Sequence, residues 1–169
     1  MTVCSGNVPA NVYLEGIGKM IALGADHAGY ELKNIIKEHL GQKGFQILDF
    51  GTDTSESVDY PDYGFKVGQA IIEKKAALGI VVCGTGIGIS IAANKVQGIR
   101  AALCTDSYMA RMAREHNNAN VLAIGSRVIG PGAALDIVDT FLASSFLGWR
   151  HTRRIEMITE YERGNSQKI

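Results

Sequence analysis

The chain has 169 residues, and 46% of them are hydrophobic, which suffices for one full core and is too little for two ordinary domains. Seventeen basic residues balance seventeen acidic ones, so the overall charge favours neither nucleic acid nor an acidic membrane surface as a partner. No apolar run approaches the roughly 20 residues that span a bilayer, so we expect no membrane insertion.

Residues 1–19 show no sustained periodicity and no signal-peptide order, and we expect an extension or a tag there. From residue 20 onward, short apolar runs typical of buried parallel strands alternate with helix-length segments. The expected strands cover residues 20–25, 45–50, 79–82, 100–103 and 121–124, and the expected helices 30–40, 61–77, 87–96, 106–117, 133–144 and 151–162. This alternation predicts right-handed βαβ units and an α/β domain over residues 20–162, with a tail over 163–169.

A glycine-rich segment, Cys-Gly-Thr-Gly-Ile-Gly at 83–88, follows the third expected strand directly. Such a turn leaves backbone N–H groups at a helix start, where they can hold an anion and favour thiolate over thiol at Cys83. Cys83 as a small buried hydrophobe is the alternative. The dinucleotide fingerprint is only partial, because Ile89 stands at its third glycine position, and no Gly-Lys-Ser or Gly-Lys-Thr of a phosphate-binding loop occurs.

Ligands of open α/β sheets bind beyond the carboxyl ends of the strands. Every expected strand ends there in polar or reactive groups, although turns and helix caps alone would supply some of them. The groups are Asp26 and His27, Asp59 and Tyr60, Cys83, Thr105 and Asp106, and Ser126 and Arg127. His116, where a helix ends and the fifth strand approaches, is a candidate proton carrier projecting over this rim, or an ordinary helix-end histidine.

Basic residues cluster near the C-terminus. Arg150 and Arg154 are four apart, so on one helix they share a face and can grip a phosphate, unless they are simply a solvated helix end. Arg127 is a third candidate phosphate ligand. The histidines lack metal-binding spacing, and we expect no metal. The cysteines, at 4, 83 and 104, fit neither a disulfide framework nor a zinc pattern, which favours a reducing compartment and a cytoplasmic protein.

A thiol base, an amide-lined loop, a histidine and phosphate-binding arginines suit proton transfer next to a carbonyl group. The base removes the proton, and the N–H groups hold the enediolate oxygen. This chemistry is the aldose–ketose isomerisation of a sugar phosphate, and it requires no cofactor.

Seven segments also occur in the order and with the gaps of a known family: 26–29 (DHAG), 59–61 (DYP), 83–95 (CGTGIGISIAANK), 98–101 (GIRA), 116–117 (HN), 120–127 (NVLAIGSR) and 150–154 (RHTRR). Together they resemble type B ribose-5-phosphate isomerase, over residues 20 to about 162. The resemblance implies a Rossmann-like αβα sandwich with five parallel strands, and at least a homodimer whose active sites are built from both subunits.

The resemblance also implies residue roles. Cys83 moves the proton between C1 and C2, His116 opens the furanose ring, and Asp26 and Thr85 complete the catalytic set. The remaining substrate contacts are Gly84, Gly86, Ile87 and Gly88 around the enediolate, Asn117 on a sugar oxygen, His27 and Tyr60 in the pocket, and Arg127, Arg150, His151 and Arg154 at the phosphate.

Several alternatives stay open. Galactose-6-phosphate and allose-6-phosphate isomerases share this scaffold, so the sugar is not settled, although the cysteine loop and the arginine pair favour ribose 5-phosphate. A non-catalytic module that binds a nucleotide or a sugar phosphate is the rival from another class, but it gains nothing from Cys83. An oxidoreductase using the partial glycine fingerprint is a third.

Overall fold

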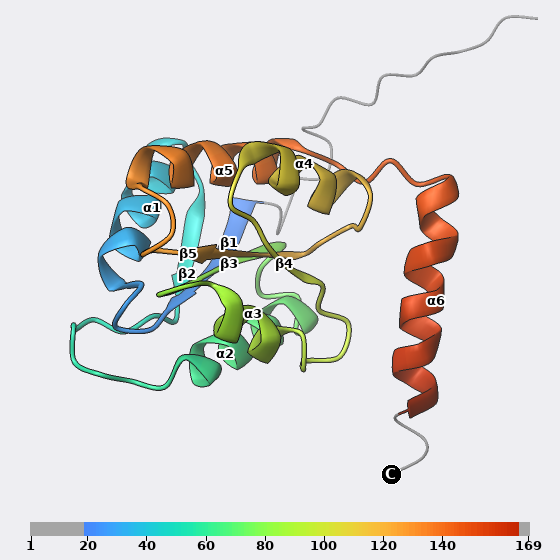
Figure 1. Ribbon diagram of the computed structural model, residues 1–169, viewed down its shortest axis with the longest axis horizontal. Coiled ribbons are helices and arrows are strands. Elements are labelled where there is room, and N and C mark those ends of the chain that lie inside the picture. The colour runs from blue at the N-terminus through green and yellow to red at the C-terminus, as the bar shows by residue number, and fades with distance from the viewer. Residues whose placement is uncertain (1–18, 166–169) are drawn as a thin grey trace, which may run out of the picture.

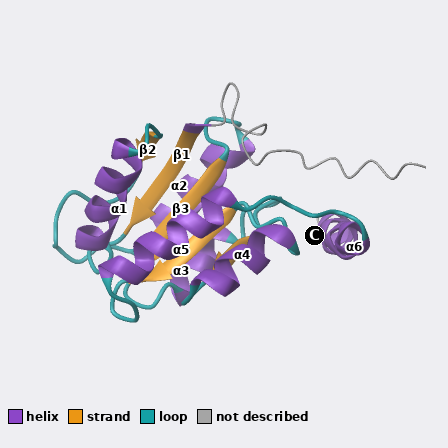
Figure 2. Cartoon of the chain, turned by 90° about the horizontal axis from the view of Figure 1, so that it is seen from above, coloured by secondary structure: helices purple, strands orange, loops and turns teal. Residues whose placement is uncertain are grey.

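The computed structural model describes residues 19–165 and contains one sheet of five parallel strands in the order β2-β1-β3-β5-β4. The strands are β1 (Met20–Ala25), β2 (Gln46–Asp49), β3 (Leu78–Cys83), β4 (Ala101–Leu103) and β5 (Val121–Gly125). Helices α1 (Tyr30–Gln42), α4 (Ser107–Glu115) and α5 (Pro131–Ala143) cover one face, and α2 (Tyr60–Ile72) and α3 (Ile87–Ala93) cover the other (Figures 1 and 2). The expected three-layer αβα sandwich is confirmed.

The sheet separates two hydrophobic clusters, because successive strand residues point to opposite faces. On one face Leu23 packs with Ile36 of α1 and Phe141 of α5, and all three are fully buried. On the other face Val81 packs with Val67 of α2. The central strands β1 and β3 are therefore apolar throughout, as a sheet covered on both sides requires.

Two helices, α2 and α3, end three or more residues before the expected position. Helix α2 stops at Ile72, not near residue 77, because the chain turns through Lys74, whose φ is +58°, and buries Ala76 in the core before β3. Helix α3 stops at Ala93, not at 96. There the Asn94 side chain makes two hydrogen bonds, of 2.8 and 2.9 Å, with the backbone of Ala101 and so leads the chain into β4.

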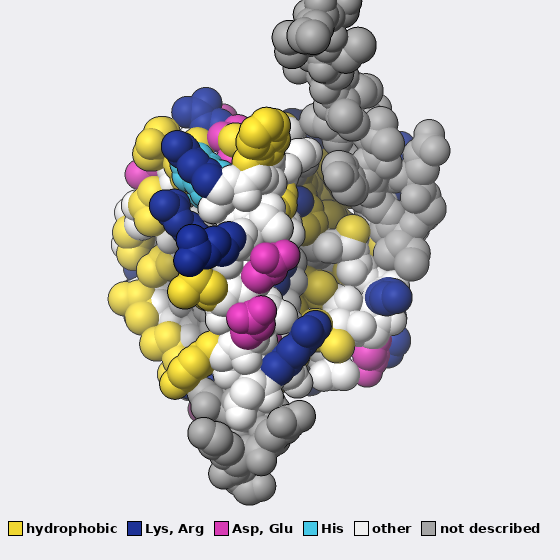
Figure 3. Space-filling view, turned by 90° about the vertical axis from the view of Figure 1, so that its right-hand side faces the viewer, with side chains coloured by type: hydrophobic (Ala, Val, Ile, Leu, Met, Phe, Trp, Pro, Cys, Tyr) yellow, Lys and Arg dark blue, Asp and Glu magenta, His cyan; other side chains and the backbone are white. Residues whose placement is uncertain are grey.

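The last helix, α6 (Arg150–Asn165), lies apart from the sandwich, at the far side of the molecule from α1 (Figure 1). It includes residues 163–165, for which the sequence predicts a tail. The Glu162 carboxylate accepts the Gly98 N–H and ties α6 to the body. Apolar side chains gather along one side of α6 (Figure 3); the exposed ones on it and before it are Leu147, Trp149, Met157, Ile158 and Tyr161.

The expected extension falls almost entirely on residues 1–18, which lie outside the described part of the chain. Among the helices between residues 19 and 165, none is long and apolar enough to cross a membrane.

Candidate active site

The thiol of Cys83 ends β3 at the carboxyl edge of the sheet. Its sulfur accepts the N–H of Gly86 at 3.2 Å, and the residue is 4% exposed. Gly86 has a φ of +77°, and a Cβ there would lie 2.5 Å from the Leu103 side chain and 2.8 Å from the Ile124 carbonyl carbon. Only glycine fits, so the loop can bring an N–H group to the sulfur, where it stabilises negative charge.

The turn after β1, which carries Asp26 and His27, lies beside this loop, because a Cβ on Gly84 would be 3.6 Å from the Ala28 Cβ. The buried Asp26 carboxylate accepts the N–H of Gly29 at 3.0 Å, which fixes it at the start of α1. His27 accepts the N–H of Val58 at Nδ1, at 3.2 Å. A neutral His27 ring therefore carries its proton on Nε2, where it is a hydrogen-bond donor.

Three further predicted residues line the same loop. Tyr60 begins α2, and a Cβ on Gly88 would lie 2.6 Å from its ring, so the phenol packs directly on the loop backbone. The Thr85 hydroxyl accepts the Ile87 N–H at 3.3 Å. The Arg127 side chain passes within 3.5 Å of where a Cβ on Gly84 would lie. We call this group the strand-end site: Asp26, His27, Tyr60, Cys83, residues 84–88 and Arg127.

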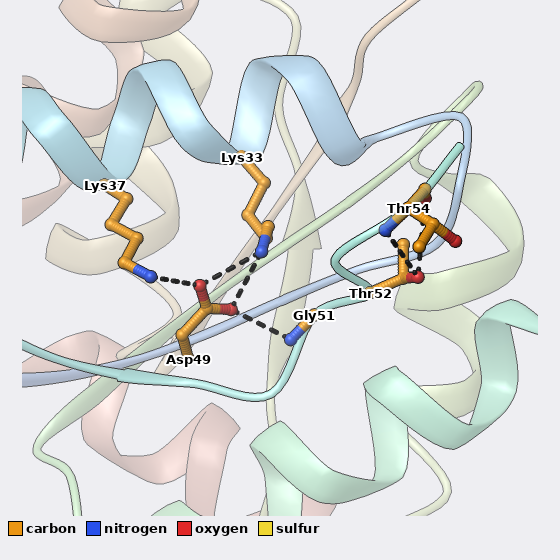
Figure 4. Close-up of polar contacts among 6 residues, drawn as sticks. All are labelled: Lys33, Lys37, Asp49, Gly51, Thr52 and Thr54. Atoms are coloured by element: carbon orange, nitrogen blue, oxygen red, sulfur yellow. Dashed lines mark hydrogen bonds and ion pairs between the residues drawn. The ribbon is translucent and has the colours of Figure 1, made fainter. Parts of the chain in front are cut away.

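A buried ion pair anchors the loop that runs from β2 toward His27 and Tyr60. Lys33, which is 1% exposed, lies 3.0 Å from the carboxylate of Asp49, and Lys37 lies 2.8 Å from it (Figure 4). The same carboxylate accepts the Gly51 N–H at 2.9 Å. Burial opposes ionisation of Asp49, but the bonds from Lys37, Lys33 and Gly51 hold its pKa below the ordinary value.

The other predicted residues form a second group, the helix-end cluster: His116, Asn117, Arg150, His151 and Arg154. The rings of His116 and His151 stack with centroids 4.1 Å apart and planes 9° apart. Helix α6 does begin at Arg150, so Arg150 and Arg154 share a face. Burial lowers the pKa of His151, and nearby positive charges, led by His116, lower it further.

The helix-end cluster is not at the carboxyl edge of the sheet. Helix α4 follows β4 and runs back along it, so His116 lies toward the amino ends of the strands, near Asn120, whose N–H donates to the Arg100 carbonyl before β4. The expectation that His116 projects over the rim of its own chain is therefore wrong. Arg150, His151 and Arg154 also lie away from the rim, on the first turns of α6 (Figure 1).

Two contacts of the strand-end site were not predicted. The Val58 N–H that orients His27 belongs to the backbone of a loop and leaves no sequence signal. Ser126 stands in one of the quoted motifs, but its hydroxyl bonds to residues far away in the sequence. Over residues 19–165 no three His, Cys, Asp or Glu side chains gather to hold a metal ion.

Comparisons with known proteins agree on one family. The family model "Ribose/Galactose Isomerase" matches residues 21–158. Ribose-5-phosphate isomerase B of Escherichia coli is 49% identical over 144 residues, covering 85% of this chain and 97% of the relative. D-erythrulose-4-phosphate isomerase of Pectobacterium atrosepticum is 48% identical over 143 residues, covering 84% of this chain and 94% of the relative.

Solved structures share the fold. Ribose-5-phosphate isomerase B of Clostridium thermocellum has a TM-score of 0.86 and 57% identity, covering 86% of this chain and 99% of that one. The Mycoplasma genitalium enzyme with bound ribulose-5-phosphate has a TM-score of 0.82 and 44% identity, covering 85% of this chain and 96% of that one.

Proposed function

The chain belongs to the ribose/galactose isomerase family, and from that premise we propose that it interconverts ribose 5-phosphate and ribulose 5-phosphate through an enediolate. The observation that carries the proposal is the Cys83 sulfur, held 3.2 Å from a glycine-loop N–H at the carboxyl edge of the sheet. The names of the relatives, and the ribulose-5-phosphate bound to one of them, support this choice of substrate.

In the proposed mechanism the Cys83 thiolate removes the proton from C2 of the open-chain aldose. The C–H bonding pair becomes the C1–C2 double bond, and negative charge develops on O1. Backbone N–H groups of residues 84–88 hold that oxygen. The thiol then returns the proton to C1, while O2 gives up its proton, O1 gains one, and O2 becomes the carbonyl oxygen.

A complete site needs two copies of the chain. The strand-end site holds the base, whereas the proposed ring-opening group His116 and the phosphate ligands Arg150 and Arg154 lie away from the carboxyl edge of the same chain. We place the helix-end cluster of one copy over the strand-end site of another. Exposed Ile87 and Ile91 beside the Cys83 loop supply apolar surface for such a homodimer, or a higher homo-oligomer.

Mixing two impaired variants tests this sharing of residues. Cys83→Ala and His116→Asn, refolded together in equal amounts, restore about one quarter of wild-type activity, because half the dimers are mixed and one of their two sites is intact. A mixture of Cys83→Ala with Cys83→Ser is the matched control and stays inactive. No recovery in the first mixture shows that each chain uses its own residues.

The sugar is the second question, because a relative named for D-erythrulose 4-phosphate is as similar to this chain as the ribose-phosphate enzyme. We propose ribose 5-phosphate as the preferred substrate. A panel of four-, five- and six-carbon aldose phosphates, scored for ketose formation, decides it: kcat/KM is highest for ribose 5-phosphate. A higher value for a four-carbon or six-carbon sugar reassigns the substrate but keeps the isomerase chemistry.

The reducing compartment is part of the proposal. Cys83 and Cys104 are both free and buried thiols, which fits a cytoplasmic enzyme.

A further inference from the structure

Ser126 directly follows β5 and joins separate segments of the strand-end site. Its hydroxyl donates to the Ala28 carbonyl at 2.7 Å, across 98 residues of sequence, and the Cys83 carbonyl is a second acceptor at 3.2 Å. The N–H of Ser126 also donates to the Cys83 carbonyl, at 2.9 Å. One side chain thus links the end of β3 to the turn that carries Asp26 and His27.

These bonds fix the direction of two peptide groups in the glycine loop. The Cys83 carbonyl points to Ser126, and the Gly84 carbonyl accepts the Arg127 N–H at 3.0 Å. In a trans peptide the N–H points opposite to the carbonyl, so the N–H groups of Gly84 and Thr85 face away from this turn. Neither N–H has a hydrogen-bond partner within residues 19–165.

We propose that Ser126 is a positioning residue of the isomerase reaction, acting through its hydroxyl on the Cys83 peptide and on the Ala28 turn. The inference rests on the proposed function. Ser126 touches no reacting atom in this scheme. It keeps the free N–H groups of Gly84 and Thr85, the Cys83 sulfur and the Asp26 turn in one mutual geometry, on which stabilisation of the enediolate depends.

Three variants separate this role from a general effect on folding. Ser126→Ala removes the hydroxyl, and Ser126→Thr keeps it. Ser144→Ala is the matched control, because the Ser144 hydroxyl also donates to a backbone carbonyl at 2.7 Å, that of Thr140 at the end of α5. For each variant we would measure kcat, KM, the affinity for inorganic phosphate and the unfolding temperature.

Ser126→Ala loses one neutral hydrogen bond that orders the groups around the transition state, which lowers kcat about five- to tenfold. KM and phosphate affinity stay within about twofold, because the arginines and His27 remain. Ser126→Thr recovers most of kcat, and Ser144→Ala keeps it while its unfolding temperature falls as much as that of Ser126→Ala. The proposal is overturned if Ser126→Ala keeps wild-type kcat, if threonine fails to restore it, or if phosphate affinity falls in parallel.

A measurement without turnover keeps this proposal separate from the proposed function. If the wild-type protein isomerises no sugar phosphate, the proposed function is wrong. The rate of Cys83 alkylation by iodoacetamide then decides whether Ser126 positions Cys83. Cys83 is 4% exposed in the wild-type protein. Without the Ser126 hydroxyl bonds its sulfur becomes more accessible, so Cys83 in Ser126→Ala is alkylated at least about threefold faster. An equal or slower rate shows that Ser126 does not position Cys83.

Discussion

The strand-end site and the helix-end cluster differ in how they are held. The first lies on buried strand ends, where Asp26 and Cys83 are each at most 5% exposed and backbone hydrogen bonds cross from one segment to the next. The second joins the end of α4 to the start of α6 through one ring stack, and Glu162 ties α6 to the body farther along; Arg150 and Arg154 are exposed. Proton transfer needs close alignment of atoms, whereas charge attraction to a phosphate tolerates more movement. The more tightly held region therefore suits the proton transfer between C1 and C2, and the exposed arginines of the looser one suit the phosphate. His116, the proposed ring-opening group, is held in the looser region by the ring stack.

The largest effect is expected from removing the base. Cys83→Ala or Cys83→Ser lowers kcat by about 10²–10⁴-fold, the usual contribution of a positioned general base, and leaves affinity for inorganic phosphate unchanged. Steady-state kinetics and calorimetry on the same samples measure both quantities. A variant with near-normal turnover removes Cys83 from the mechanism.

Cys104 supplies the matched control for that experiment. Burial raises the pKa of its thiol to about 12, and Asp106 adds to the rise, so it stays protonated and resists alkylation at neutral pH. Cys104→Ala should keep the turnover. Iodoacetamide should inactivate the wild-type enzyme by labelling Cys83, and inactivation with label on Cys104 alone would contradict this assignment.

The next largest effect is expected from breaking the buried Lys33–Asp49 ion pair, which anchors the loop after β2. Asp49→Ala leaves the buried Lys33 charge without its carboxylate and lowers the free energy of unfolding by about 3 kcal/mol. Lys33→Met replaces the charge by an apolar side chain, while Lys37 still pairs with Asp49, so the loss stays below about 1 kcal/mol. Urea denaturation of the two variants measures the difference, and equal losses would show that the ion pair is not the cause.

How much of this structure the sequence predicts depends on how far apart in the sequence the interacting residues lie. The glycine loop after 80–82 and the start of α6 at the Arg150 cluster follow from local patterns, and the structure has both. The early end of α3 depends on bonds from Asn94 to β4, which no local pattern records. The position of His116 follows from topology, because a helix that follows a parallel strand runs back to the amino edge of the sheet. Nearness to β5 in the sequence does not place His116 at the carboxyl edge.

A smaller effect is expected from a change in the helix-end cluster. Arg154→Ala removes one charge-assisted contact to the phosphate and weakens binding of inorganic phosphate and of sugar-phosphate inhibitors about tenfold. Calorimetry with a neutral sugar analogue is the control, because that ligand has no phosphate to lose. Equal weakening of all three ligands would mean that Arg154 supports the fold instead.

The smallest expected effect is on the pH dependence of folding stability, through His151 in the His116–His151 stack. Since burial and nearby positive charges lower the folded-state pKa of His151, the unfolded chain binds a proton more readily than the folded one. The contribution of His151 to stability is therefore complete above its unfolded pKa of about 6.5 and declines as the pH falls through that value.

Unfolding temperatures at about pH 7.5 and about pH 5.5 measure this loss, which should be smaller in His151→Gln than in the wild type. His39→Gln is the control, because the His39 ring lies 2.9 Å from the Asp139 carboxylate, outside the helix-end cluster. This variant keeps the His116–His151 stack, so the part of the acid-induced loss that comes from His151 should remain. If His151→Gln loses as much stability as the wild type, the helix-end cluster does not respond to acid in this range, and its looseness must come from exposure alone.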